Sequence, residues 1–167
     1  MLLPILDARA AGNASSQPAG GVDPESLAVA RRIRERGSAK VGLVPLHAGF
    51  EVMPTARRLA RAFEVLGDQV EILDTQSPPV AVEGTDAPRL DDRPAALERA
   101  LEDAGARLPR VLVAFGAQDG AGPAAALLSA LDGIVLVARP GGATEFRLHS
   151  WMRRIDPRRH LGVLLVE

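Results

Sequence analysis

Cysteine and tyrosine are absent from this chain of 167 residues, and Lys40 is its single lysine. Without cysteine, the chain has no disulfide and no thiolate metal site. Without tyrosine, it cannot phosphorylate itself on tyrosine. The phosphate-binding loop of a P-loop protein needs a lysine that reaches the β- and γ-phosphates. Because Lys40 precedes the first predicted strand, residues 41–44, it cannot be that lysine.

The chain also has little net charge and no long apolar run. Its formal net charge is −1, so no basic surface predicts a nucleic-acid partner. No apolar run approaches the roughly 20 residues that cross a bilayer, so we expect no membrane insertion. The apolar start, residues 1–6, is too short for a signal sequence. We therefore expect a cytoplasmic location.

Composition divides the chain into a leader and one domain. Residues 1–22 are predicted to be a flexible leader, because Ala, Gly, Ser and Pro dominate from residue 7 onward. Residues 23–167 are long enough to bury one hydrophobic core and predict a single α/β domain.

Short apolar runs alternate with stretches of helical periodicity along this domain. The predicted strands are residues 41–44, 70–73, 111–115, 134–137 and 162–166. Helices are predicted between them, and the helix before the third strand is expected to end at Gly105. Parallel strands need crossover helices, so this alternation is typical of a parallel sheet covered on both faces. We predict a three-layer α/β sandwich with a mainly parallel central sheet, like that of P-loop NTPases.

Ligands of such folds bind at the carboxyl ends of the strands. The loop after the first strand, residues 45–55, contains one glycine and several bulky apolar residues, whereas a phosphate loop has several glycines. Glu51 adds negative charge where a phosphate would lie, although Thr55 could still supply a hydroxyl. His47, Gly49, Glu51 and Thr55 are therefore interpreted as vestigial positions of a nucleotide loop.

Asp74 ends the second predicted strand and is the fifth vestigial position. It could activate a water molecule or hold a magnesium ion, or it could be a turn acid, which is the commoner role. A hydrolase of this type would carry a metal-binding acid after the third strand, where this chain has Ala114 and Phe115. The sequence therefore predicts no metal site and no cofactor.

The three histidines, His47, His149 and His160, do not have the spacing of metal ligands. His47 lies at the functional edge of the sheet, but no nucleophile pattern accompanies it as a catalytic base would require. We therefore predict no catalytic residue.

A basic cluster, residues 31–36, lies on the first predicted helix. Charge runs are usually solvated faces. The alternative is a docking surface for a partner or for a neighbouring copy, in which Arg31 and Arg34 are the candidate contacts.

The order of features resembles the MinD/ParA-type deviant P-loop proteins, and among them the cytoplasmic tyrosine autokinase domains of capsule and exopolysaccharide synthesis. Residues 132–144 resemble the family's "ADGVLLVVRPGxT", and residues 67–74 are similar to its "GxxVLLID". Residues 41–44, followed by Thr55 and residues 59–63, resemble its strand, phosphate loop and "NLARAL" helix, and residues 161–166 are similar to its closing strand. Residues 25–36 are similar to its leading helix, which carries arginines and mediates ring assembly.

The departures from this family fall on its catalytic positions. The Walker lysine position is held by Val52 or Met53, the acid of the third strand has become Ala114 or Phe115, and the tyrosine-rich tail is absent. The resemblance thus implies a pseudo-kinase, without catalytic activity, that binds an inner-membrane polysaccharide chain-length or export protein and is recruited to the membrane by it. The resemblance is also compatible with a homo-oligomer. The alternative is a small-molecule or nucleotide-binding enzyme with a non-standard site around residues 45–55.

Overall fold

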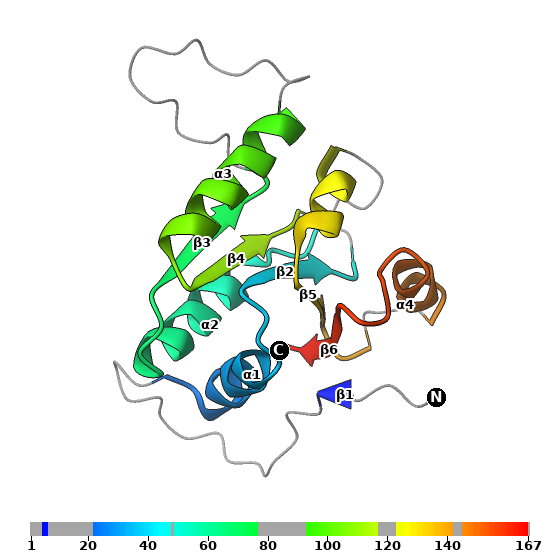
Figure 1. Ribbon diagram of the computed structural model, residues 1–167. Coiled ribbons are helices and arrows are strands. Elements are labelled where there is room, and N and C mark those ends of the chain that lie inside the picture. The colour runs from blue at the N-terminus through cyan, green and yellow to red at the C-terminus, as the bar shows by residue number, and fades with distance from the viewer. Residues whose placement is uncertain are drawn as a thin grey trace.

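A six-stranded, entirely parallel sheet forms the centre of the computed structural model, which describes residues 5–6, 22–47, 49–76, 93–116, 123–141 and 145–166. The strand order is β1-β6-β5-β2-β4-β3 (Figure 1). The strands are β1 (Ile5–Leu6), β2 (Lys40–Pro45), β3 (Val70–Asp74), β4 (Arg110–Ala114), β5 (Gly133–Ala138) and β6 (His160–Leu165). The central strands β4 and β5 are buried throughout, as near-continuous apolar runs in a covered parallel sheet should be.

Helices cover both faces of this sheet. They are α1 (Pro24–Glu35), α2 (Met53–Val65), α3 (Arg93–Arg107), the 3₁₀ helix η3 (Pro123–Ala130) and α4 (Glu145–Met152). One core cluster joins α1 and α2 to one face of the sheet, and a second joins α3, η3 and the α4 region to the other. Figure 1 shows α1 and α2 together on one side of the sheet and α3 on the other. The predicted three-layer α/β sandwich with a parallel sheet is confirmed.

The structure differs from the sequence-based prediction in three elements. β1 pairs in parallel with β6, within the segment that composition predicts to be a flexible leader; the other leader residues up to 21 lie outside the described part. Residues 123–130 form a 3₁₀ helix, which periodicity alone did not distinguish from an α-helix. α3 continues past Gly105 to Arg107, so the prediction that it ends there was wrong.

Gly105 does not end α3 but makes room for a neighbouring side chain. A Cβ atom at this position would lie 2.5 Å from Cε of Lys40. The stem of the single lysine therefore packs across α3 at the point where no side chain obstructs it.

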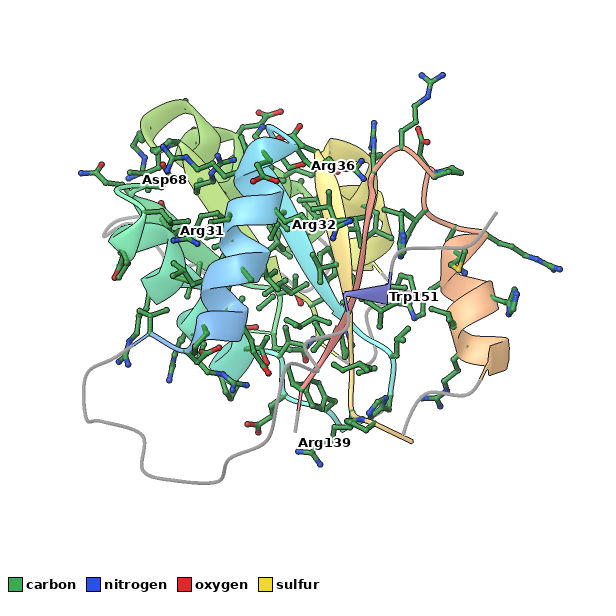
Figure 2. The ribbon with its side chains drawn as sticks, turned by 90° about the horizontal axis from the view of Figure 1, so that it is seen from below. Arg31, Arg32, Arg36, Asp68, Arg139 and Trp151 are labelled. Atoms are coloured by element: carbon green, nitrogen blue, oxygen red, sulfur yellow. The ribbon has the colours of Figure 1, made fainter. Side chains whose placement is uncertain are left out.

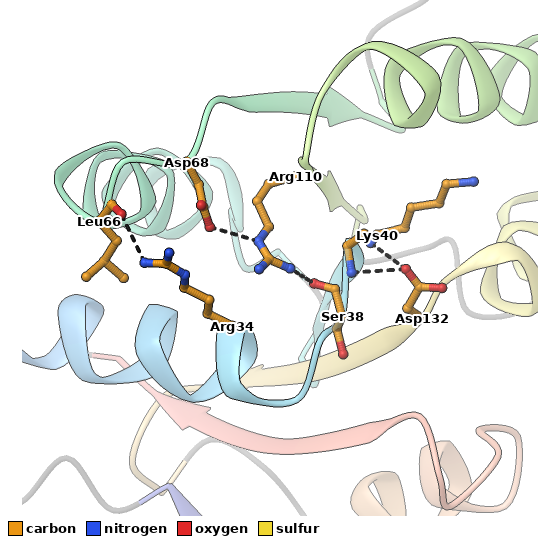
Figure 3. A network of polar contacts seen from close by, with 8 residues as sticks. Arg34, Ser38, Lys40, Leu66, Asp68, Arg110 and Asp132 are labelled. Carbon is orange, nitrogen blue, oxygen red and sulfur yellow. Dashed lines mark hydrogen bonds and ion pairs between the residues drawn. The ribbon is translucent and has the colours of Figure 1, made fainter.

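The amino ends of the strands are tied together by a polar network (Figure 3). Arg110 Nε donates to Asp68 Oδ2 at 3.0 Å, and Arg110 Nη1 donates to the carbonyl oxygen of Ser38. Asp132 Oδ2 accepts the backbone N–H groups of Ala39 and Lys40 at 3.0 and 2.8 Å. This network fixes where β2, β4 and β5 begin, at the edge opposite to the one where ligands of such folds bind.

No helix within the described ranges is both long enough and apolar enough to cross a membrane.

Candidate functional site

The carboxyl edge of the sheet brings together the loops that follow β2 and β5. His47 Nε2 accepts the backbone N–H of Arg139 at 3.1 Å. The Phe50 ring lies 5.6 Å from the His47 ring, and the Arg139 guanidinium carbon lies 5.3 Å from the Phe50 centroid. In Figure 2, Arg139 lies at one end of the sheet, and Arg36 and Asp68 lie at the other. The loop after β2 is therefore hydrogen-bonded to the loop after β5.

Apolar side chains of the loop after β2 point into the protein. Leu46, Phe50 and Val52 are 2%, 9% and 3% exposed, and the last two belong to the same core cluster as α1 and α2. Gly49 adopts a positive φ of 76°, a backbone conformation that favours glycine. A phosphate loop must turn its backbone N–H groups toward the space that the phosphate occupies. This loop instead anchors itself by burying side chains.

The polarity of the loop is also unlike that of an anion cradle. Arg147 Nη1 donates to the carbonyl oxygen of Leu46 at 3.3 Å, so the loop presents an acceptor to a cation. Glu51 is exposed and negative, and Thr55 is buried in the first turn of α2. The N-cap of α2 is Val52, whose side chain makes no capping hydrogen bond.

Lys40 lies at the other end of β2 from this loop. It is the first of the six residues of β2, so a rise of ~3.3 Å per residue places its Cα about 17 Å from that of Pro45. Its side chain packs against Gly105 of α3. The conclusion from the sequence, that Lys40 does not serve the loop, has a geometric basis.

The ends of β3 and β4 are closed by local hydrogen bonds. Asp74 Oδ1 accepts the backbone N–H of Gln76 at 2.9 Å, the pattern of a turn acid. Thr75 Oγ1 accepts the N–H of Gly116 at 3.1 Å. A Cβ at Gly116 would lie 2.1 Å from Nε2 of Gln76, so that side chain covers the end of β4. Of the two roles open to Asp74, these contacts favour the turn.

The end of β4, where the family resemblance led us to expect a metal-binding acid, is apolar and buried. Ala114 and Phe115 are 2% and 3% exposed at the end of β4. In the described ranges, no three His, Asp or Glu side chains are grouped closely enough to hold a metal ion.

The structure separates the three histidines. His47 lies at the carboxyl edge, and its Nδ1 is buried without a hydrogen-bond partner among the described residues. His149 is exposed on α4. His160 begins β6 at the amino edge, where burial lowers its pKa from the ordinary 6.5.

The two arginines named as candidate partner contacts have different surroundings. Arg34 Nη1 donates to the carbonyl oxygen of Leu66 at 3.0 Å and so links α1 to the end of α2. Arg31 is exposed on α1. The sequence did not single out Arg139 or Arg147 as site residues. The strand before Arg139 is apparent in the sequence, but both arginines contact residues about a hundred positions away, and such contacts leave no local sequence pattern.

No protein-family model and no curated protein matches the chain, but solved structures share its fold. The kinase domain of the Escherichia coli tyrosine kinase ETK has a TM-score of 0.64 at 15% identity, covering 93% of this chain and 82% of that one. The chimeric protein CapA2B2 has a TM-score of 0.68 at 12% identity, covering 89% and 86%. The BceF tyrosine kinase domain has a TM-score of 0.62 at 18% identity, covering 84% and 74%. At these identities, the similarity shows a shared fold and carries no activity over to this chain.

Proposed function

We propose that this chain is a catalytically inactive domain with the fold of bacterial tyrosine kinases, acting as an interaction or regulatory partner in exopolysaccharide synthesis or export. Capsule and adhesin polysaccharides are the two forms that the family resemblance suggests. The partner is an inner-membrane chain-length or export protein, which holds the domain at the cytoplasmic side of the membrane. The domain needs neither a nucleotide nor a metal for this role.

The proposal is supported above all by the packing of the loop after β2. Its apolar residues Phe50 and Val52 are buried in the core, and His47 binds the backbone of Arg139. Opening this loop around a triphosphate would expose both apolar side chains, each worth roughly 1.5–3 kcal/mol when fully buried. A nucleotide would also meet Glu51 without a lysine to offset its charge.

Thermal unfolding in magnesium and ATP tests the nucleotide-free part of the proposal. A ligand at 100 times its dissociation constant adds about 2.7 kcal/mol of stability, which such a scan detects. We expect the same melting temperature with magnesium chloride alone and with Mg-ATP. A rise that disappears in Thr55→Ala would contradict the proposal.

Affinity purification of the tagged chain from its native cell tests the partner. We expect an inner-membrane protein of polysaccharide synthesis or export to be recovered equally with and without ATP. Recovery that depends on ATP would contradict a nucleotide-independent role.

A second candidate function is a small-molecule site at residues 45–55, and one observation favours it. His47 Nδ1 is buried without a hydrogen-bond partner among the described residues, and an orphaned polar atom is costly unless a water molecule or a ligand satisfies it. A metabolite screen by the same thermal scan would detect such a ligand, and His47→Phe would abolish the shift.

A further inference from the structure

The helical layer formed by α1 and α2 is far more basic than the chain as a whole. Residues 24–36 and 53–65 carry seven arginines against three glutamates, a net charge of +4, whereas the whole chain has −1. On the opposite face, residues 93–107 of α3 carry three arginines against three acids. The layer formed by α1 and α2 is therefore more basic than α3, although residues 145–159, on the same side as α3, carry five arginines against two acids.

All seven arginines are exposed, and the side chains of six of them have no ionic or hydrogen-bond partner among the described residues. We call them the arginine face: Arg31, Arg32, Arg36, Arg57, Arg58 and Arg61. The ion pairs found in the described ranges, Arg107–Glu71 and Arg110–Asp68, lie elsewhere. The seventh, Arg34, is engaged with the carbonyl oxygen of Leu66. The charges of the arginine face are available to another molecule.

Part of this face is concave. A depression of about 600 Å³ is lined by Ala28, Arg31, Arg32, Glu35 and Arg36, residues three or four apart that share one side of a helix. Figure 2 shows Arg31, Arg32 and Arg36 projecting from α1. Three of the five lining residues are arginines, and Glu35 is the one acid among them.

We propose that the arginine face docks a carboxylate-rich segment of the partner protein. The inference rests on the proposed function, which makes this chain an interaction domain, and adds the surface and the chemistry of its partner. Guanidinium groups pair with carboxylates in a two-pronged geometry. A depression among them admits protruding side chains of a polypeptide.

A bilayer and a second copy of the chain fit this face less well. Val65 is the one large hydrophobic side chain that is exposed among the described residues, so the face lacks the apolar anchors of membrane-surface helices. A planar bilayer also does not fill a depression. A second copy that docked through α3 would offer balanced charges, which do not complement a net charge of +4.

Fluorescence anisotropy with a labelled oligoglutamate peptide tests the docking surface on the full chain. We expect saturable binding that weakens as salt is added. Arg31→Gln/Arg32→Gln/Arg36→Gln should weaken binding about tenfold, since three exposed charge pairs together are worth ~1.4 kcal/mol. The matched control is Arg99→Gln/Arg153→Gln/Arg158→Gln, which removes the same charge from exposed positions outside the face and should have little effect.

Equal weakening by both triple variants would overturn the proposal, because binding would then follow net charge alone. Failure of oligoglutamate to bind the unaltered chain would also overturn it. Two further probes identify the other occupants: vesicles of phosphatidylcholine with phosphatidylglycerol, and a synthetic peptide of residues 77–92, which carry four acids and one arginine. Binding of either probe alone, without oligoglutamate, would assign the face to a membrane or to a second copy and reject the proposal.

These results separate the two proposals. If oligoglutamate does not bind and Mg-ATP leaves the melting temperature unchanged, the docking surface is wrong and the proposed function stands. If Mg-ATP binds at the loop after β2, the proposed function is wrong whether or not oligoglutamate binds.

Discussion

His47 Nε2 accepts the backbone N–H of Arg139 at 3.1 Å and so joins the loop after β2 to the loop after β5. The two residues are far apart in sequence, and the bond lies at the carboxyl edge of the sheet, where ligands of such folds bind. It therefore links two loops of that edge.

Replacing His47 with alanine should weaken this edge of the sheet. We expect the free energy of unfolding to fall by about 1 kcal/mol, the typical net contribution of one hydrogen bond. Urea denaturation measures it. His47→Gln keeps an acceptor near the position of Nε2 and should recover most of the loss; equal losses in the two variants would show that the bond is unimportant.

The polar network at the amino edge of the sheet should contribute more to the free energy of unfolding than the His47–Arg139 hydrogen bond does. Asp68 and Arg110 are paired with side chains 14% and 10% exposed, and the Arg110 guanidinium lies 5.5 Å from the Phe63 centroid. Asp68→Ala leaves a largely buried cation unpaired and should cost about 3 kcal/mol in urea denaturation.

Glu71 provides the matched control for that pair. Its partner Arg107 is 65% exposed, so Glu71→Ala should cost less than about 1 kcal/mol. Similar losses in Asp68→Ala and Glu71→Ala would contradict the role given to the buried pair.

Two glycines should respond differently to the same substitution. A Cβ at Gly42 of β2 would lie 2.6 Å from Leu131 Cδ1 and 3.1 Å from Phe115 Cε2, both in buried residues, so Gly42→Ala should cost about 1–3 kcal/mol through overpacking. At Gly105 the obstacle is the flexible stem of Lys40, and alanine gains about 1 kcal/mol of helix propensity. Thermal unfolding of both variants should therefore show a large loss only for Gly42→Ala.

The half-buried His160 predicts an acid-sensitive stability. Burial lowers its pKa below the ordinary 6.5, so between these values the unfolded chain binds a proton that the folded chain does not. The free energy of unfolding should therefore fall as the pH is lowered through 6.5, until the lowered pKa is reached.

His160→Leu should flatten this dependence, measured by urea denaturation across the same pH range. The matched control is His149→Gln, at an exposed histidine. An identical slope in His160→Leu and the unaltered chain would contradict the assignment.

Local patterns in the sequence predicted most of the fold. The apolar runs of β2, β4 and β5 and the periodicity of α1 and α2 are strong because these elements bury continuous surfaces. β1 was missed because two residues are too few for a pattern, and its pairing with β6 is a long-range event. The end of α3 was misplaced because glycine commonly ends helices, whereas Gly105 makes room for Lys40.

The candidate site was predictable only in part. The missing lysine and the bulky loop are properties of the sequence, and they pointed to residues 45–55. That Phe50 is buried, that Arg147 binds the carbonyl of Leu46, and that Asp74 holds the backbone of Gln76 depend on how the chain folds back on itself. The arginine face likewise became visible only when α1 and α2 were found side by side.

The central claim is that the loop after β2 does not bind a nucleotide, and amide NMR of the labelled chain tests it most directly. On titration with Mg-ATP, the N–H resonances of Gly49, Glu51 and Thr55 should not move, because buried side chains and the His47–Arg139 bond hold the loop closed. Saturable shifts of these resonances, with micromolar affinity and lost in Thr55→Ala, would contradict the account.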